Sequence, residues 1–336
     1  MLINVLAADT TAGLLTSREL DLGDLGPNQV DVRVTHAGIC HTDVGMIDNE
    51  WGFTQYPLVP GHELVGEVVA VGTAATGITV GQRVGVGALC GSCMTCEWCL
   101  SGKQHVCPKS VATIFGGHQG GFASHVRVDD FRFAFPLPDA LASEHAAPLM
   151  CAGATAFTPF VHYDVKPTDR VAIVGIGGLG HLAVQYAAAW GCEVTAISST
   201  SAKRQEAETF GAHHFVASSD GGAMRAVRGA YDFILSTVGA DLPWTEYVEA
   251  LRPQGTLCIA GTSPSPFAVS LYHLLGAERR VVGGKTGAIE DTATMLEFTV
   301  RHGITPVIEK FAMDDVNTAI DRVRHNDVRY RAVLEA

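Results

Sequence analysis

The sequence has no excess of basic residues: 23 Lys and Arg stand against 35 Asp and Glu, which gives a formal net charge of −12. It also has no dense basic stripe of the kind that a phosphate backbone attracts, so nucleic acid is excluded as an expected partner. No apolar run reaches the roughly 18 residues of a membrane-spanning helix, and we expect no membrane association. The first residues lack the basic segment and small-residue cleavage site of a secretory signal. We therefore expect a cytoplasmic protein.

Nine cysteines in a chain without a secretory signal favour metal binding over disulfides. Four of them form one pattern, Cys93-x2-Cys96-x2-Cys99-x7-Cys107. Four thiolates at this spacing can surround one Zn2+ and leave no open position, which is typical of a structural site. The alternatives are a chance cluster or a redox pair. Cys90 stands just before the set, outside its spacing, and is either a competing ligand or a free thiol.

The chain is long enough for two domains, with 336 residues of which 47% are hydrophobic. Short alternating or apolar runs broken by glycine predict a compact, barrel-like β domain in the first third; they are residues 29–36, 63–71, 82–87 and 123–128. From about Lys166, apolar strands alternate with helix-length segments, which predicts a doubly wound parallel sheet. The tail from Asp291 to Ala336 has the pattern helix, strand, helix, strand.

A glycine-rich turn follows the first strand of the predicted parallel sheet. Residues 171–174 form an apolar run typical of a buried strand, residues 179–190 have the pattern of a helix, and Gly175, Gly177 and Gly180 lie at the junction in G-x-G-x-x-G spacing. Glycines at this spacing allow a tight turn and a close approach to a pyrophosphate, and the helix N-terminus offers free N–H groups. An ordinary strand-to-helix turn is the alternative. A second strand, residues 193–197, favours the dinucleotide interpretation.

No Asp or Glu stands at the end of that second strand, where an NAD site usually has one to bind the ribose 2′-OH. The chain instead has Ser198, Ser199 and Thr200, followed by Lys203. Hydroxyl groups and a nearby cation suit a 2′-phosphate, which a carboxylate would repel. The alternative is that this cluster only caps the next helix, and both can hold together. The pattern therefore predicts NADP(H).

A second set of metal ligands is spread along the chain: Cys40 in GICHTD, His62 and Glu63 in PGHE, and Cys151 in PLMCAGATAF. Spacing alone does not show that these residues meet. If they do, two thiolates and one imidazole leave a fourth position for water or a carbonyl group, as a catalytic zinc requires. For each cysteine taken singly, a small buried hydrophobic residue is the alternative.

These strings, with PLVPGHELVGEVVAVG, GIGGLGHLAVQYAAAWG and the ending DVRYRAVLE, occur in the order found in zinc-dependent medium-chain alcohol dehydrogenases. The chain most resembles the cinnamyl alcohol dehydrogenase group, including its bacterial broad-range aldehyde reductases. The resemblance implies an α/β fold with a GroES-like catalytic domain at residues 1–145, completed by residues 286–336. It also implies a Rossmann NADP(H)-binding domain at residues 146–285, two Zn2+ per chain and a homodimer.

The resemblance also implies a role for particular residues. Cys40, His62 and Cys151 would be the catalytic-zinc ligands, and Glu63 a carboxylate able to exchange onto that metal. The structural zinc would be held by Cys93, Cys96, Cys99 and Cys107. Cofactor contacts would come from the turn and the second strand, namely Gly175, Gly177, Gly178, Leu179, Gly180, Ser198, Ser199, Thr200 and Lys203.

In such a site, zinc polarises an aldehyde oxygen, the nicotinamide delivers hydride, and Thr42 passes a proton to the developing alkoxide. The family's proton relay continues to a histidine three residues beyond this threonine, where the chain has Gly45. We therefore expect reduction of a small aldehyde, or oxidation of a primary alcohol, with an aromatic or medium-chain substrate. The alternatives are reduction of an iminium ion or a conjugated alkene, and a non-catalytic zinc protein that binds NADP(H).

Three aromatic residues in predicted loops are candidates for the substrate pocket: Trp51, Phe53 and Phe115. Rings near the proposed ligands would line an apolar pocket that accepts a ring-bearing substrate. Ordinary core packing is the alternative for each of them.

Overall fold

The computed structural model describes residues 1–336 and divides into two compact units. Unit 1 comprises Met1–Ala154 and Gly287–Ala336, and unit 2 comprises Thr155–Thr286. The limits expected from the sequence, 145/146 and 285/286, differ mainly at the first boundary. Residues 146–154 belong to unit 1 because they pack tightly on its sheet: a Cβ on Gly85 would lie only 2.3 Å from Met150 Sδ.

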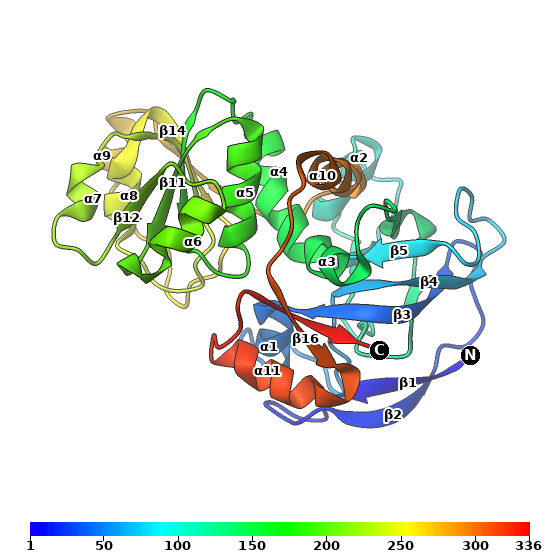
Figure 1. Cartoon of the computed structure of the whole chain (residues 1–336). Helices are drawn as coiled ribbons and strands as arrows, with labels where there is room; N and C mark the ends of the chain where they lie inside the picture. The colour runs from blue at the N-terminus through cyan, green and yellow to red at the C-terminus, as the bar shows by residue number, and fades with distance from the viewer. The chain divides into compact units, whose positions relative to one another are not determined.

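Unit 1 is built on a seven-stranded, mostly antiparallel sheet with the order β16-β17-β3-β4-β5-β9, in which β8 also pairs with β3. Its strands are β3 (Val30–Ile39), β4 (Glu63–Val71), β5 (Arg83–Val86), β8 (His125–Val128), β9 (Ala134–Pro136), β16 (Ile308–Ala312) and β17 (Arg331–Glu335). The tail returns to the start of the chain, because β17 pairs with β3 in the register Ala332↔Ile39. Figure 1 shows this C-terminal strand beside β3.

Smaller elements surround the sheet of unit 1. They are the hairpin β1 (Leu2–Ala7) and β2 (Thr16–Asp21), the pair β6 (Leu89–Gly91) and β7 (Val111–Ala112), and the helices α1 (His41–Ile47), α2 (Glu97–Leu100), α3 (Ser143–Pro148), α10 (Ile289–His302) and α11 (Val316–Arg324). The sequence did not predict the β1–β2 hairpin. Almost every residue of β2 is exposed, so this strand has no apolar alternation to detect.

Unit 2 contains a six-stranded parallel sheet with the order β12-β11-β10-β13-β14-β15. Its strands are β10 (Arg170–Val174), β11 (Glu193–Ser198), β12 (His214–Ala217), β13 (Tyr231–Ser236), β14 (Leu251–Ile259) and β15 (Arg280–Gly283). The helices are α4 (Ala154–His162), α5 (Gly180–Trp190), α6 (Arg204–Thr209), α7 (Ala223–Ala226), α8 (Trp244–Ala250) and α9 (Leu271–Leu275). The strand order reverses between β10 and β13, so the turn after β10 lies at the topological switch point where such sheets bind ligands.

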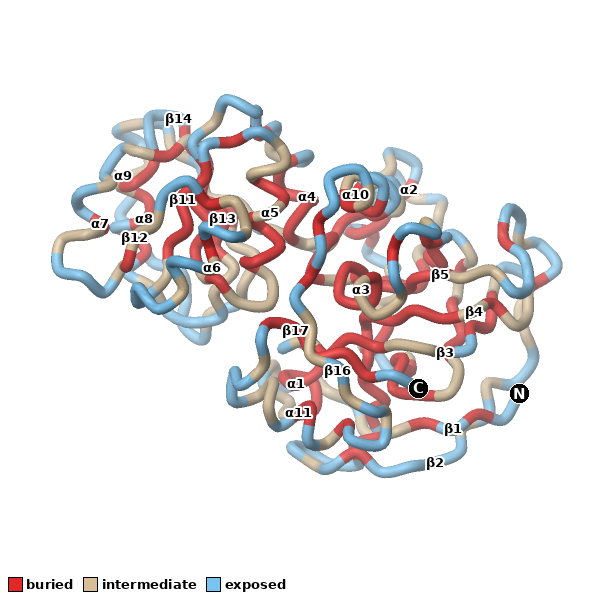
Figure 2. Tube along the Cα trace, in the orientation of Figure 1, coloured by how far each residue is buried: buried red, intermediate tan, exposed pale blue.

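Most buried residues lie in the central strands of the two large sheets, and exposed ones lie mainly in loops, in helices and in β2 (Figure 2). The central strands of unit 2 are largely apolar: Val171, Ala172 and Ile173 of β10 are fully buried. This is the pattern expected of a parallel strand covered on both faces. No helix of the chain combines the length and apolar character that a bilayer span requires.

A buried ion pair joins two strands of unit 1. Arg127 on β8 lies directly opposite Asp31 on β3, and its guanidinium donates two hydrogen bonds to the carboxylate, at 2.8 and 2.9 Å. The same guanidinium donates to the carbonyl of Asp24 at 2.9 Å. Because both side chains are buried, removing the charge of one would leave the other without its hydrogen-bonded counterion.

Asp31→Asn should therefore lower the free energy of unfolding by about 3 kcal/mol or more. Glu67→Gln is the matched control, because Glu67 pairs with Arg33 on the same strand in a solvent-exposed ion pair and should cost less than about 1 kcal/mol. Urea unfolding of the zinc-loaded protein, followed by circular dichroism, measures both changes. Equal, small shifts for the two variants would contradict the importance of the buried pair.

Candidate functional site

The structure brings Cys40, His62, Glu63 and Cys151 together in unit 1, with one ligand atom of each lying within 4.8 Å of all the others. The sheet register explains this. Gly38 of β3 pairs with Glu63 of β4, so the residue that follows β3 lies beside the start of β4. Cys151 comes from a π-helical turn, Leu149–Gly153, which follows α3. Sequence spacing could not show that these residues meet.

The carboxylate of Asp43 orients this cluster. It accepts hydrogen bonds from the backbone N–H of Cys40 at 2.9 Å and of Gly61 at 2.8 Å, and it lies 2.9 Å from His62 Nδ1. A carboxylate only accepts, so Nδ1 carries a proton and Nε2 is the nitrogen left for a metal ion. Nε2 is buried and has no hydrogen-bond partner. An imidazole held by a carboxylate on one nitrogen, with the other unpartnered, is the usual arrangement of a metal ligand.

The electrostatics of the cluster favour a positive charge at this position. Burial alone lowers the pKa of His62, but the Asp43 carboxylate and Cys40 together outweigh burial and raise that pKa well above its ordinary value. The hydrogen bond from the Cys151 thiol, with His62 nearby, holds the pKa of Cys40 well below its usual range. The same contact raises the pKa of Cys151. A metal ion can replace the protons that these groups otherwise share.

Arg331 on the C-terminal strand β17 forms a buried ion pair with Glu63. Burial raises the pKa of the Glu63 carboxyl to about 8, and the Arg331 guanidinium opposes that shift. Glu63 Oε1 has no hydrogen-bond partner. Gly38 makes room for the carboxylate, because a Cβ there would lie 2.2 Å from Glu63 Oε2. Glu63 therefore has a free oxygen beside the two cysteines and a counterion behind it.

Sequence reasoning missed both Asp43 and Arg331. Asp43 had a detectable signal, since it lies three residues after a proposed ligand in the string GICHTD. The role of Arg331 had no signal in the neighbouring sequence, because its partner Glu63 is 268 residues away in the chain.

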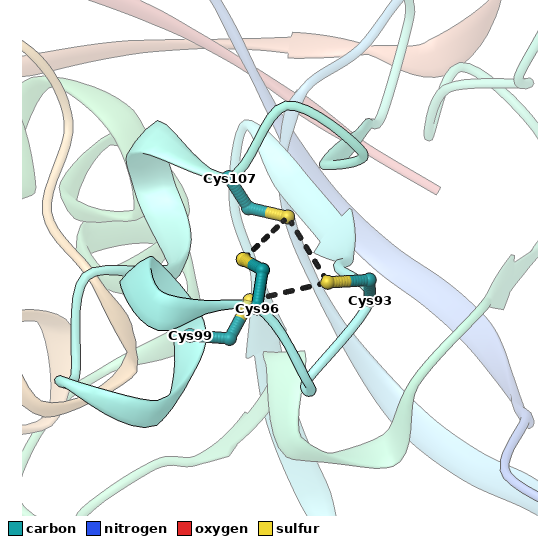
Figure 3. Close-up of side chains that lie close together, drawn as sticks. All are labelled: Cys93, Cys96, Cys99 and Cys107. Carbon is teal, nitrogen blue, oxygen red and sulfur yellow. Dashed lines mark hydrogen bonds between the residues drawn. The ribbon is translucent and has the colours of Figure 1, made fainter.

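The four clustered cysteines of unit 1 point toward one another (Figure 3). Their sulfur atoms lie 3.9 Å apart for Cys93 and Cys99, 3.7 Å for Cys96 and Cys107, and 3.5 Å for Cys107 and Cys93. A tetrahedron of thiolates with Zn–S bonds of about 2.3 Å has sulfur atoms about 3.8 Å apart. The set therefore fits a closed zinc site, and no further protein ligand is needed.

The predicted cofactor residues lie around one turn of unit 2. Gly175 has a φ of +87°, which an L side chain rarely adopts, and a Cβ on Gly180 would lie 1.7 Å from the carbonyl oxygen of Gly175. Leu179 precedes the first residue of α5, and Gly178 lies within the turn. Lys203 reaches this turn, since its ammonium donates to the carbonyl of Ile176 at 2.6 Å. Ser198 ends β11 and is followed by Ser199 and Thr200.

The space beside Gly45 in α1 is filled. A Cβ at that position would lie 2.7 Å from Trp51 Cη2 and 2.9 Å from Glu50 Oε2, so a larger residue such as histidine would require both side chains to shift. Thr42, on the same helix, accepts a long hydrogen bond of 3.8 Å from the Cys40 thiol. Its hydroxyl therefore lies next to a proposed metal ligand.

The three aromatic candidates for the substrate pocket lie together. The ring centroids are 6.1 Å apart for Trp51 and Phe53, and 5.8 Å apart for Phe53 and Phe115. Trp51 and Phe115 also pack against the core of unit 1, whereas Phe53 is 55% exposed. Their role in binding substrate stays a prediction.

Comparison with known proteins identifies the family of the chain. A family model described as the alcohol dehydrogenase GroES-like domain matches residues 26–139, and one described as zinc-binding dehydrogenase matches residues 178–301. The chain is 44% identical to aldehyde reductase AdhA of Synechocystis, over 99% of this chain and 98% of the relative. It is 40% identical to vomilenine reductase of Rauvolfia serpentina, over 98% of this chain and 93% of that protein.

Two solved structures extend the comparison. A cinnamyl alcohol dehydrogenase of Sorghum bicolor superposes with a TM-score of 0.95 at 38% identity, covering 100% of this chain and 98% of that one. A cinnamyl alcohol dehydrogenase of Helicobacter pylori complexed with NADP(H) gives a TM-score of 0.91 at 28% identity, with the same coverage. The expected fold class, a GroES-like domain plus a Rossmann domain, is confirmed.

Cys99→Ser should remove about one zinc per chain and lower the midpoint of thermal unfolding, because a structural zinc contributes directly to folding free energy. Cys192→Ser is the control: Cys192 is a buried thiol of unit 2 whose sulfur donates a hydrogen bond to the carbonyl of Lys166, at 3.4 Å, and its change should leave the zinc content intact. Metal analysis after gel filtration measures both. Full zinc content in Cys99→Ser would rule out the four-cysteine site.

Proposed function

The chain belongs to the zinc-dependent medium-chain alcohol dehydrogenases, in the cinnamyl alcohol dehydrogenase group, and on that premise we propose that it transfers hydride between NADP(H) and a primary alcohol or aldehyde. The proposed substrate is aromatic or of medium chain length. The observation that supports this most is the buried, unpartnered Nε2 of His62, which faces a cluster with two thiols. Three such ligands leave a fourth position for a substrate oxygen.

When bound, Zn2+ supplies Lewis-acid polarisation of the substrate oxygen, and NADP(H) supplies the hydride. Cys40, His62 and Cys151 are the proposed ligands, and Asp43 holds His62 in the tautomer whose Nε2 can bind. Glu63, with a free Oε1 and its charge balanced by Arg331, is a carboxylate that can approach the same metal. The Thr42 hydroxyl is the proposed group that passes a proton to the alkoxide formed from an aldehyde.

A second candidate function is reduction of an iminium ion or a conjugated alkene by the same site. The filled space beside Gly45 favours it, because neither the glycine nor the Trp51 ring can continue a proton relay. One relative is named for the reduction of vomilenine, so names within this group extend beyond simple aldehydes. Carbonyl reduction remains our first proposal because Thr42 and the complete ligand set are present.

The 2′-phosphate of NADP(H) is the proposed partner of Ser198, Ser199, Thr200 and Lys203. The support is the Lys203 ammonium at the glycine-rich turn, together with the absence of a carboxylate at the end of β11. A solved relative of the group binds the same cofactor.

We also propose a cytoplasmic homodimer. All nine cysteines are free thiols, which suits a reducing compartment. Short helix α9 exposes Leu271, Tyr272 and Leu275 by 70 to 79%, and the next strand, β15, is an edge of its sheet. An apolar surface beside an unpaired strand edge suits a second copy of the chain. Cell fractionation tests the location, and sedimentation velocity tests the oligomeric state.

Incubation of the zinc-loaded protein with cinnamaldehyde and NADPH should yield cinnamyl alcohol, because the carbonyl oxygen is the atom that the open ligand set can bind. Cinnamaldehyde also has a conjugated double bond, so the product separates the two candidate functions. Chromatographic identification of the product is the measurement. Formation of hydrocinnamaldehyde would support alkene reduction instead. Absence of any product, with this or any other aldehyde, would contradict the first proposal.

Lys203→Ala should raise KM for NADPH by about 10-fold or more and leave KM for NADH nearly unchanged, since a hydrogen bond to a charged group contributes about 1.5–3 kcal/mol. Ser199→Asp should shift the preference toward NADH, because a carboxylate repels the 2′-phosphate. Lys166→Ala is the control: that ammonium pairs with the exposed Asp164 instead. Steady-state kinetics with both cofactors measure the effect. An equal loss for NADPH and NADH would show that Lys203 only supports the turn.

A further inference from the structure

A third cluster of metal-binding side chains lies in unit 1, separate from the two sites above. Cys90 on β6, His118 in the loop after β7 and Asp129 directly after β8 each place one ligand atom within 4.8 Å of the other two. Cys90 is fully buried, and the other two are half-buried. None of the three is among the residues proposed for the catalytic or structural zinc.

The hydrogen bonds of His118 fix which of its nitrogens can bind a metal. Nδ1 lies 2.7 Å from the carbonyl oxygen of Gln119 and 3.3 Å from that of Thr113. Carbonyl oxygens only accept, so Nδ1 carries the proton and Nε2 keeps its lone pair. That lone pair faces Cys90, with 3.3 Å between Nε2 and Sγ. Metal-bound histidines typically donate their other N–H to a carbonyl or carboxylate in this way.

The separation of these two atoms also matches coordination. With Zn–S of about 2.3 Å and Zn–N of about 2.0 Å, sulfur and nitrogen are about 3.5 Å apart on a tetrahedron. An S–H···N hydrogen bond between thiol and imidazole accounts for the same distance without a metal. The carboxylate of Asp129 is the feature that such a hydrogen bond leaves unexplained.

Asp129 is held against Cys90 by its surroundings. The backbone N–H of Asp130 donates to the carbonyl of Cys90 at 3.0 Å, which joins the end of β8 to β6. Gln29 Nε2 donates to Asp129 Oδ1 at 3.0 Å and orients the carboxylate. Gly91 keeps the space open, since a Cβ there would lie 3.1 Å from the Cβ of Asp129.

We propose that Cys90, His118 and Asp129 form a third metal site, which takes Zn2+ through Sγ, Nε2 and a carboxylate oxygen, with water as the fourth ligand. A thiolate and a carboxylate balance the two charges of the cation, so the bound site is neutral, as its burial requires. Sulfur and imidazole ligands select Zn2+ and its transition-metal neighbours over Mg2+ and Ca2+. Binding forms the Zn–S bond and releases the thiol proton of Cys90 to solvent.

A metal ion at this site would stabilise the segments beside the four-cysteine loop. Strand β6 leads directly through Ser92 into Cys93, the first cysteine of that loop. A metal at Cys90 would tie β6 to the loop after β7 and to the end of β8. The site has one thiolate, where the two sites proposed above have two and four, so it should fill after them. It does not depend on the proposed catalytic activity.

The test is a titration of the full-length protein, loaded with two zinc ions per chain so that only the third site is open, with Co2+ at neutral pH. We expect one additional Co2+ per chain, with sulfur-to-cobalt charge-transfer absorption in the near ultraviolet and the visible bands of four-coordinate cobalt. Added Zn2+ should abolish these bands, whereas Mg2+ should not. Zinc released during the titration is measured in parallel. Release of one zinc for each cobalt bound would mean exchange at an existing site and would overturn the proposal.

Three variants assign the signal to this cluster. Cys90→Ala should abolish the charge-transfer band. His118→Asn keeps a donor for the carbonyl of Gln119 but removes Nε2, and Asp129→Asn keeps the acceptor for Gln29 but removes the charge. Each of these two changes should weaken Co2+ binding by about 10-fold or more. Loss of an outer-shell partner alone lowers metal affinity by about that factor, and these residues are proposed direct ligands. Cys192→Ala, another buried thiol without a histidine partner, is the matched control and should bind as the parent does.

No additional Co2+, binding only at millimolar Co2+, or an unchanged titration in His118→Asn would each overturn the site. His118 lies half-buried in a loop, so its variant remains informative if Cys90→Ala, which changes a core residue, fails to fold.

Discussion

The carboxylate of Asp43 is the group on which the geometry of the candidate active site depends. It binds the N–H of Cys40, the N–H of Gly61 and Nδ1 of His62, and it is fully buried. A buried carboxylate without such partners would be costly, so the three donors and the acceptor stabilise one arrangement together. Two proposed ligands on different segments are thereby held in place before any metal binds. The unpartnered Nε2 of His62 follows from the same contact.

Residues from both parts of unit 1 form the site, because the C-terminal strand contributes to it. Arg331 on β17 balances Glu63, which lies directly after His62. The pairing of β17 with β3 places this guanidinium next to the turn that carries Cys40. Because a buried charge without its counterion is strongly destabilising, folding of the tail and formation of the ligand cluster are physically coupled. This coupling holds although the whole of unit 2 separates the two parts of unit 1 in the sequence.

The cysteines of the two units illustrate how surroundings decide the role of one side chain. In unit 1, thiols lie beside other thiols or beside an imidazole, where a cation can replace their protons. In unit 2, Cys192 and Cys258 are buried alone, and burial raises the pKa of each to about 12. Such thiols act as small apolar residues. Cys90 has the same raised pKa of about 12, but it faces an imidazole, and its surroundings therefore permit a different role.

The sequence by itself determined the two-domain α/β organisation, the closed cysteine set and the glycine-rich turn, because each rests on local periodicity or on ligands close together in the chain. The order of strands and helices in unit 2 follows directly from its apolar runs. The meeting of Cys40, His62 and Cys151 could be inferred only from the family resemblance. Tertiary structure alone decided the partners of Asp43, the counterion Arg331, the filled space beside Gly45 and the position of Cys90 against His118. These contacts join segments far apart in the chain, and strand register and packing, which local sequence patterns do not encode, bring them together.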